Sequence, residues 1–509
     1  MFCKRLHCTI RRILSQDDND GFFKVLNGFL LDFGSAEYYN LTVIDFGLRV
    51  KEMKEKTGGA QDLTQGKVGK KMLSFFFPIL IGLLFQQLYN TADAVIVGHF
   101  VGDDALAAVG GTTASITNLI IGFFTGLNAG ATVLISQMYG SGDEKTLSRV
   151  LHTAVIFCSL VGLSITVLGY FFTPGMLTLL GNPTDIQEES VLYLRIYLEG
   201  AIFLLLYNLF QGTMQSVGDS ARPLKYLITS CLTNIVLDLL FVGVLDLNVA
   251  GAAWASVLSM MLCTALAAVH LMREKGPHKL SVKKLDLEWS ILKRILRIGL
   301  PGGVQSSMYA ISNLIIMAAV NTFGTQIVTA WTATGKLDGF YWSTSNAFGI
   351  ALCAFVGQCY GAGKLERMKQ GVRFTMKTAL VTTVCLSVLL LSVARPAYHI
   401  FLKEEQTIED AITIMWYFVP FYFIWSFIEV LTGTFRGVGD TLRPMIITMI
   451  GTCVFRVIWM LFVVPAWHTV MSVSIVYGIS WVLTAGAFII YYLKGKWLKQ
   501  NNIIDTQEQ

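Results

Sequence analysis

The stretch G-T-M-Q-S-V-G-D-S-A-R-P-L at residues 212–224 returns as G-T-F-R-G-V-G-D-T-L-R-P-M at residues 433–445. Each copy joins two long apolar stretches, and the copies lie 221 positions apart. The same separation carries Q-M-Y-G-S-G, which begins at Gln137, onto Q-C-Y-G-A-G, which begins at Gln358. Two anchors at one spacing predict an internal duplication whose unit is about half of the protein.

The composition is that of a membrane protein. Of the 509 residues, 54% are hydrophobic and only 14% are charged, and the mean hydropathy is +0.58. Soluble domains carry about 25% charged residues. Apolar stretches of about 20 residues, the length that crosses about 30 Å of hydrocarbon, recur along the chain. We expect an all-α polytopic membrane protein with about twelve transmembrane helices, near residues 74–98, 112–138, 150–173, 190–211, 223–245, 250–271, 295–320, 332–360, 373–394, 411–433, 444–466 and 471–492.

The loops between these spans alternate in charge. Basic residues follow the even-numbered spans, at Lys145, Arg149, Arg222, Lys225, Lys364, Arg367, Arg436, Arg443, Lys494 and Lys496. The opposite loops carry acids, at Asp185, Glu188, Glu404 and Glu409. Because basic loops stay in the cytoplasm, we predict a multi-pass protein of the plasma membrane, the inner membrane of a bacterium, with both termini cytoplasmic. The net charge of +5 then belongs to these loops, and we expect no nucleic-acid partner.

The duplication divides the chain into two lobes of six spans. We expect a first lobe at residues 70–272, a basic cytoplasmic linker at 273–293, a second lobe at 294–494 and a cytoplasmic tail at 495–509. An even number of spans in each lobe gives both lobes the same membrane orientation. Residues 1–69 form a cytoplasmic lead-in, in which 1–52 match no span. Our hypothesis is that translation starts at Met53, and the alternative is a weakly ordered tail.

The repeated turns have a structural explanation. Glycine permits the positive φ that ends a helix, aspartate accepts hydrogen bonds from nearby amides, and proline begins a helix where no N–H is needed. We therefore interpret two sets of four residues as structural, namely Gly218, Asp219, Arg222 and Pro223, and their equivalents Gly439, Asp440, Arg443 and Pro444. A gating role for the two Asp–Arg pairs is the alternative.

The motif N-T-A-D-A-V-I-V-G-H-F-V-G at residues 90–102, together with the two repeated motifs, resembles the multidrug and toxic compound extrusion (MATE) family. The resemblance covers about residues 70–495. It implies a twelve-helix exporter whose two six-helix lobes surround a central cavity and which expels organic cations or other amphipathic compounds in exchange for H⁺ or Na⁺. Flippases of lipid-linked saccharides belong to the same superfamily, so export of such a precursor remains an alternative.

Acids inside the predicted spans are few. Asp93 ends a polar patch in the first span, and Asn234 and Asp238 stand four residues apart on one face of the fifth. Two carboxyl groups in a poorly solvated pocket cannot both ionise freely, so they can share a proton. With added amide and hydroxyl oxygens they can instead coordinate Na⁺. The resemblance maps a cation site onto Asp93, Asn234 and Asp238 and places its hydroxyl group at Ser256.

Each of these residues has a plainer interpretation. Asp93 can lie at the outer membrane interface, Asn234 and Asp238 can link helices without coupling to an ion, and Ser256 can serve helix packing. Counted from the basic ends at about 1.5 Å per residue, Asp93 lies about 30 Å along its helix and Asp238 about 22 Å, so helix tilt has to absorb the difference.

The second lobe lacks the acid pair, since Asn234 and Asp238 fall on Phe455 and Trp459. Its unusual charge is Arg456. We expect Arg456 to pair with an acid such as Glu429 or Asp338, and engagement of a substrate is the alternative. Ion coupling is therefore assigned to the first lobe.

No catalytic or cofactor-binding pattern is present: the sequence contains no H-E-x-x-H, C-x-x-C or G-x-S-x-G motif. An intramembrane enzyme is therefore a remote alternative. We predict a monomeric secondary transporter that needs no cofactor besides its coupling ion, H⁺ or Na⁺, and that interacts with small molecules and the lipid bilayer.

Overall fold

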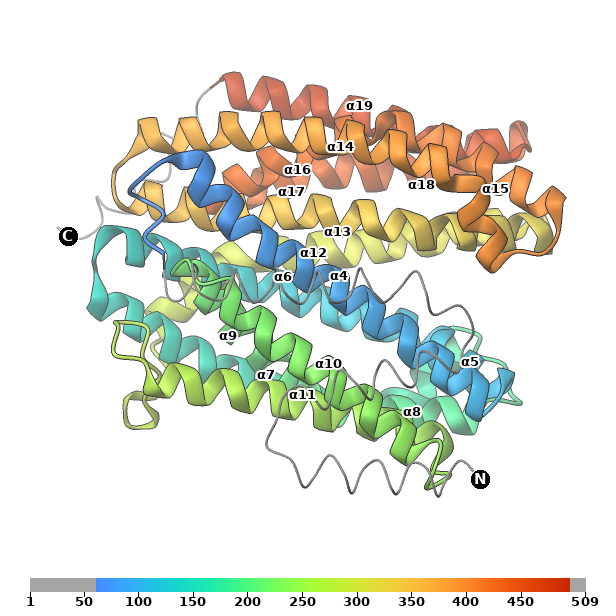
Figure 1. Cartoon of the computed structure of the whole chain (residues 1–509), viewed down its shortest axis with the longest axis horizontal. Coiled ribbons are helices and arrows are strands. Elements are labelled where there is room, and N and C mark those ends of the chain that lie inside the picture. Colours follow the sequence, from blue (N-terminus) through green and yellow to red (C-terminus); the bar gives the residue numbers. More distant parts are fainter. Residues whose placement is uncertain (1–60, 495–509) are drawn as a thin grey trace, which may run out of the picture. The chain divides into compact units, whose positions relative to one another are not determined.

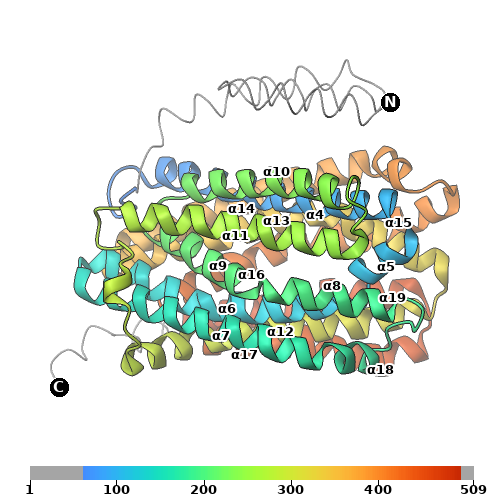
Figure 2. The same cartoon turned by 90° about the horizontal axis from the view of Figure 1, so that it is seen from below.

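The structure, a computed structural model, describes residues 61–494. The hypothesis about Met53 and the predicted tail at 495–509 lie outside these residues. The first half of the described chain forms the helices α4 (Val68–Phe100), α5 (Asp103–Gly110), α6 (Thr112–Ser141), α7 (Glu144–Leu179), α8 (Gln187–Glu199), α9 (Ala201–Ser216), α10 (Ala221–Phe241) and α11 (Asn248–Arg273). Figures 1 and 2 show these helices running roughly side by side along one direction.

A short helix, η1 (Val282–Lys284), interrupts the connection to the second half. There follow α12 (Trp289–Asn321), α13 (Thr325–Gly361), α14 (Leu365–Phe401), α15 (Glu405–Phe418), η2 (Val419–Phe421), α16 (Tyr422–Gly437), α17 (Leu442–Thr448), the π-helical segment η3 (Met449–Val454), α18 (Phe455–Ala466) and α19 (Val470–Leu493). Each of the twelve predicted spans coincides with one of these helices or with consecutive helices. The all-α prediction is confirmed for the described residues.

Within residues 61–494, ten segments are long and apolar enough to cross a membrane, and α8 with α9, which bend by 46° at Gly200, make up an eleventh. The one predicted span still unaccounted for, residues 332–360, lies in α13, which is 37 residues long but is not among these segments. Most of its second half is buried in the protein. Helix α13 can therefore carry polar residues, because its neighbours and not lipid surround it.

The first helix of each half begins against the other half. Met72 and Phe76, early in α4, belong to a core made mostly of second-half residues, whereas Val97 at the end of α4 packs in the first half. Helix α12 does the reverse, since Ile295 packs with the first half and Val320 with the second. Figure 1 shows the oblique course of α4. The two halves are thus interlocked by equivalent helices.

The repeated Q-x-Y-G-x-G motifs meet each other where α6 and α13 end. Gln137 donates from Nε2 to the carbonyl oxygen of Gly437 at 2.9 Å, and Gln358 donates to that of Ser216 at 2.7 Å. The two donors, Gln137 and Gln358, occupy equivalent positions in the duplication, and so do the two acceptors, Ser216 and Gly437. The pair is therefore a two-fold-like contact, and it joins the halves at the end of the bundle that the charge pattern assigns to the cytoplasm.

Glycines bring the two backbones together in this contact. A Cβ at Gly140 would overlap the carbonyl group of Gln358, and one at Gly361 would overlap that of Gln137. Only glycine fits at either position without movement of a main chain.

Residues 61–66, which precede α4, lie across the same junction. Gln61 donates from its amide to the carbonyl oxygen of Gly218 in the first half at 3.3 Å. In the second half, the amide of Leu63 donates to Oε1 of Gln358 at 3.1 Å. The guanidinium of Arg367 donates to the carbonyl oxygens of Leu63, Gly66 and Gln65 at 3.0, 2.7 and 2.8 Å. This segment, called the strap below, therefore contacts both halves.

Candidate functional site

Two carboxyl groups from different helices meet in the first half. Asp93 on α4 and Asp238 on α10 lie close enough for their carboxyl groups to influence each other, and the two helices pack against each other. Asn234 lies one turn before Asp238 on α10, and both residues are 0% exposed. The structure thus brings together the three residues that the sequence analysis grouped.

The polar atoms of this group lack partners. Both carboxylate oxygens of Asp238, both polar atoms of the Asn234 amide and one oxygen of Asp93 are buried without a hydrogen bond. An unsatisfied buried polar group costs about 1–3 kcal/mol, and a charged one costs more. Buried groups persist in this condition where they have a task. A proton shared by the two carboxyl groups would relieve the cost, and so would a hard cation, which prefers oxygen ligands.

Three tyrosines lie in the neighbourhood of the acids. Tyr89, Tyr193 and Tyr197 are all near enough to Asp93 to feel its charge. Tyr89 also shares a hydrogen bond of 3.2 Å with Ser256. The hydroxyl of Ser256 is therefore joined to the acids through Tyr89, and no direct bond between Ser256 and Asp93 or Asp238 is present. Sequence analysis missed Tyr193 and Tyr197, although their spacing of four residues on α8 places them on one face.

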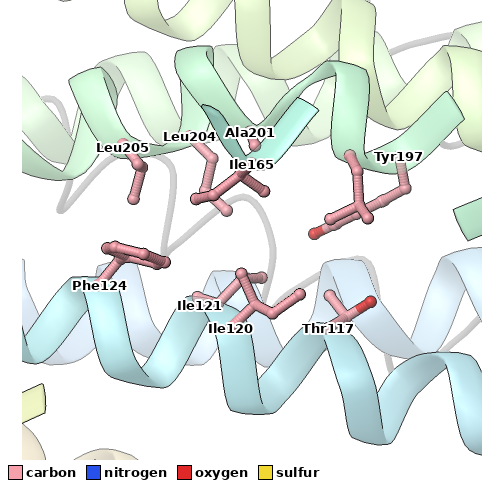
Figure 3. Close-up of a pocket in the computed structure, with 10 residues that line it drawn as sticks. Thr117, Ile120, Ile121, Phe124, Ile165, Tyr197, Ala201, Leu204 and Leu205 are labelled. Atoms are coloured by element: carbon pink, nitrogen blue, oxygen red, sulfur yellow. The ribbon is translucent and has the colours of Figure 1, made fainter. Parts of the chain in front are cut away.

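An apolar pocket lies next to this group, between α6 and the bend that joins α8 to α9 (Figure 3). The free space in this pocket is only about 10 Å³, room for about one water molecule and far below the roughly 300–1,000 Å³ of small-molecule sites. The lining is almost entirely carbon, with the hydroxyl groups of Thr117 and Tyr197 as polar groups. Since Tyr197 also lies near enough to Asp93 to feel its charge, the pocket adjoins the acids.

The second half is different at the equivalent place. Phe455 and Trp459 stand where the first half has Asn234 and Asp238. Arg456, which is 4% exposed, donates from Nε to Ser480 Oγ at 2.9 Å. Its guanidinium also lies over the ring of Tyr477, 4.0 Å from the centroid.

The expected ion pair of Arg456 is not found among residues 61–494. Asp338 instead accepts a hydrogen bond from the Tyr422 hydroxyl, and Glu429 packs against Gly349 of α13. The prediction of a pair with either acid was wrong because aromatic rings, which the sequence did not place, surround Arg456.

The repeated turns have the geometry that the sequence indicated. Gly218 and Gly439 have φ of +89° and +87°. Arg222 lies 3.2 Å from Asp219, and Arg443 lies 3.7 Å from Asp440. Pro223 and Pro444 each occupy the third position of the following helix. The Tyr491 hydroxyl contacts both Asp440 and Arg443, and at the equivalent position of the first half His270 contacts Arg222 at 3.1 Å.

The MatE family model matches this chain twice, at residues 78–240 and again at 301–462. The chain belongs to the MatE family. The two matches begin in α4 and α12, the helices related by the duplication. Membership in MatE makes the chain a multi-pass membrane transporter and not an enzyme.

Several relatives of this MatE chain have names that refer to multidrug resistance, and another is named a FAD transporter. The chain is 27% identical over 396 residues to the probable multidrug resistance protein YoeA of Bacillus subtilis, covering 76% of this chain and 85% of YoeA. It is 26% identical over 444 residues to the probable multidrug resistance protein YpnP of the same organism, covering 86% and 98%. A solved structure described as the outward-facing conformation of a multidrug resistance MATE family transporter has a TM-score of 0.80 at 23% identity, with coverage of 87% and 99%. The MatE fold therefore extends over nearly all of the described residues.

Proposed function

We propose that this MatE protein is a secondary active exporter of amphipathic, mainly cationic drugs or metabolites, driven by the entry of H⁺ or Na⁺. The observation that carries the proposal is the proximity of Asp93 and Asp238, since three of their four carboxyl oxygens are buried without a hydrogen-bond partner. The names of YoeA and YpnP favour drug export over the flippase alternative.

Coupling follows from the cost of a buried charge. When both carboxyl groups are ionised, their negative charges repel each other. This repulsion favours an arrangement in which water or a cation reaches the two groups. When H⁺ or Na⁺ neutralises the pair, α4 and α10 can pack more closely. Only a difference in ion affinity between two states can shift their balance, and this pair supplies such a difference.

The neutralised pair acts on the neighbouring pocket. Tyr197 lies near enough to Asp93 to feel its charge, and it also lines the pocket. A change in the charge of Asp93 therefore changes the packing around Tyr197. In the proposed cycle, ion entry from outside changes the packing of the first lobe in this way and lowers its affinity for the substrate, which leaves outward.

The two units that move are proposed to be the lobes at residues 70–272 and 294–494, with the basic segment 273–293 as their linker. The charge pattern of the loops supports an orientation with both termini in the cytoplasm, as for an inner-membrane protein. The protein is proposed to act as a monomer. In the state described here, Gln137 and Gln358 join the lobes at the end assigned to the cytoplasm, which corresponds to a carrier closed on that side.

The test uses the purified full chain in proteoliposomes that contain a fluorescent aromatic cation. Proton and sodium gradients are imposed separately, and efflux is followed by fluorescence. We expect efflux to rise with one of the two inward gradients. When that gradient is collapsed, efflux should return to the rate of protein-free liposomes. Efflux that ignores both gradients would overturn the coupling, whereas gradient-driven uptake would overturn the direction.

A further inference from the structure

Arg456 is a buried cation near the middle of a membrane span. It lies in the segment Leu442–Ala466, and it is 4% exposed. A charged side chain at the centre of a bilayer costs at least about 2.5–3.5 kcal/mol, so it is normally paired or has a task. No carboxylate among residues 61–494 pairs with Arg456, and its Nη2 nitrogen is buried without an acceptor.

Aromatic rings form the surroundings of Arg456. The guanidinium lies 4.0 Å from the ring centroid of Tyr477 and 5.6 Å from that of Trp481. Trp481 in turn packs against Trp425 and Trp342, with ring centroids 5.8 and 6.3 Å away. Trp342 and Tyr477 are only half-buried, so part of this aromatic surface remains accessible.

The helix that carries Arg456 is irregular just before it. The six residues of η3 (Met449–Val454) form a π-helix, whereas the equivalent residues 228–233 of the first half lie within the regular helix α10. Short π-helical segments inside α-helices are frequent at functional sites, since they change the direction of the side chains that follow. This irregularity precedes Arg456 by two residues.

The two halves therefore have opposite charges at the same place in the repeat. Arg456 is equivalent to Ile235, which lies between Asn234 and Asp238 of the acid group. We propose that Arg456, together with Tyr477, Trp481 and Trp425, forms a second-half subsite that binds the anionic group of a flat aromatic substrate. The carboxylate or phosphate of that substrate accepts from Nη2, and its ring packs on the tyrosine and tryptophan rings.

Charge and position define the occupant. An anion next to an arginine accepts charge-assisted hydrogen bonds, and aromatic faces stack with planar rings. The phosphate of a phospholipid lies at the membrane surface, about 15 Å from the centre of a bilayer whose core is about 30 Å thick. A dissolved amphiphile and not a lipid head group is thus the ligand. This inference rests on the proposed export function, and it extends the substrates to molecules that carry an acidic group.

The test compares two ligands that differ by one phosphate. FMN is riboflavin with a phosphate on its side chain, and both flavins fluoresce. We expect the full chain in nanodiscs to bind FMN at least about tenfold more tightly than riboflavin. This is the affinity difference that one hydrogen bond to a charged group provides. Equal affinities in the wild-type protein would overturn the proposal without any need for a variant.

Variants then locate the preference. Arg456→Gln should lower the affinity for FMN to that for riboflavin and leave riboflavin binding unchanged. Arg373→Gln, which removes an exposed arginine from α14 of the same half, should keep the preference for FMN. A preference for FMN that survives Arg456→Gln in folded protein would place the anion elsewhere and contradict the proposal. These titrations need no ion gradient, so they can fail while gradient-driven export of a cation succeeds, and the reverse also holds.

Discussion

Gln358 forms one hydrogen bond more than Gln137, although the two residues occupy the same position in the two halves. Each donates from Nε2 to a carbonyl oxygen of the opposite half, but Gln358 also accepts from the amide of Leu63 at 3.1 Å. The strap therefore adds to only one of two otherwise equivalent contacts.

This difference predicts unequal effects of equal substitutions. A hydrogen bond contributes about 0.5–1.5 kcal/mol, so Gln358→Ala should favour separation of the two halves at this end more than Gln137→Ala does. Spin labels at the exposed, equivalent positions Lys145 and Glu366 report that separation as a distance distribution. If Gln137→Ala has the larger effect, the strap does not stabilise the closed end.

Gly140 and Gly361 each pack closely against the backbone of the opposite half, so we predict that neither position tolerates an added methyl group. In Gly361→Ala the new Cβ would overlap the carbonyl group of Gln137, and overpacking of this kind costs about 1–3 kcal/mol. We expect a lower midpoint of thermal unfolding in detergent. Gly335→Ala on α13 is the matched control, because a Cβ there meets nothing within 4 Å. Equal midpoints for the two variants would show that the backbones do not approach as described.

The strap should loosen when Arg367 is replaced. One guanidinium holds three carbonyl oxygens of the strap, and the ammonium of lysine cannot reproduce this planar arrangement. Arg367→Lys should therefore accelerate hydrogen–deuterium exchange of the amides at residues 61–66. Lys369→Ala, which removes an exposed side chain paired with Glu366, should leave their exchange unchanged. Unchanged exchange in Arg367→Lys would mean that other contacts hold the strap.

Removal of either acid should abolish ion-driven export. Asp93→Asn and Asp238→Asn each eliminate the charge that the coupling ion neutralises, so efflux under an imposed gradient should fall to the rate of empty liposomes. Membrane insertion should persist, because an amide is easier to bury than a carboxylate. Asp185→Asn, in an exposed loop, serves as the control. Full gradient-driven efflux by Asp238→Asn would remove this residue from the coupling.

His278, between α11 and α12, predicts a pH dependence of stability. Burial lowers the pKa of His278, and nearby Glu274 opposes this only in part. Because the folded-state pKa lies below the unfolded value of about 6.5, the unfolded chain binds more protons. The contribution of His278 to stability is therefore lost as the pH falls below about 6.5.

The measurement compares unfolding midpoints of the wild-type protein and His278→Gln at several pH values between about 5 and 8. As the pH is lowered, the unfolding midpoint of the wild-type protein should fall more than that of His278→Gln. A constant difference across this range would show that His278 does not titrate in the folded protein.

Sequence reasoning recovered the helices and the acids for a physical reason. Span length and hydropathy are set by the bilayer, and the spacing of four residues put Asn234 and Asp238 on one face. The duplication also located the turns at Gly218 and Gly439.

The remaining features depend on tertiary packing. The spacing of residues along α18 does not reveal that Tyr477 and Trp481, on α19, lie against Arg456. The packing of the start of α4 and of α12 against the opposite half likewise depends on contacts between residues that are far apart in the sequence. The Q-x-Y-G-x-G motifs were recognised as repeats, but their contact with each other required the arrangement in space.

The polarity of α13 has a consequence for biosynthesis. A translocon that tests each nascent segment against lipid would find α13 a poor candidate for release into the bilayer, since it is long enough to span but too polar. Its burial in the finished protein depends on neighbours, and α4 and α6, which pack against it, are both synthesised earlier. Helix α13 should thus enter the bilayer only when α4 and α6 are already in place to pack against it. Substitutions that misfold the first half of the chain should therefore also impair membrane insertion of the second half.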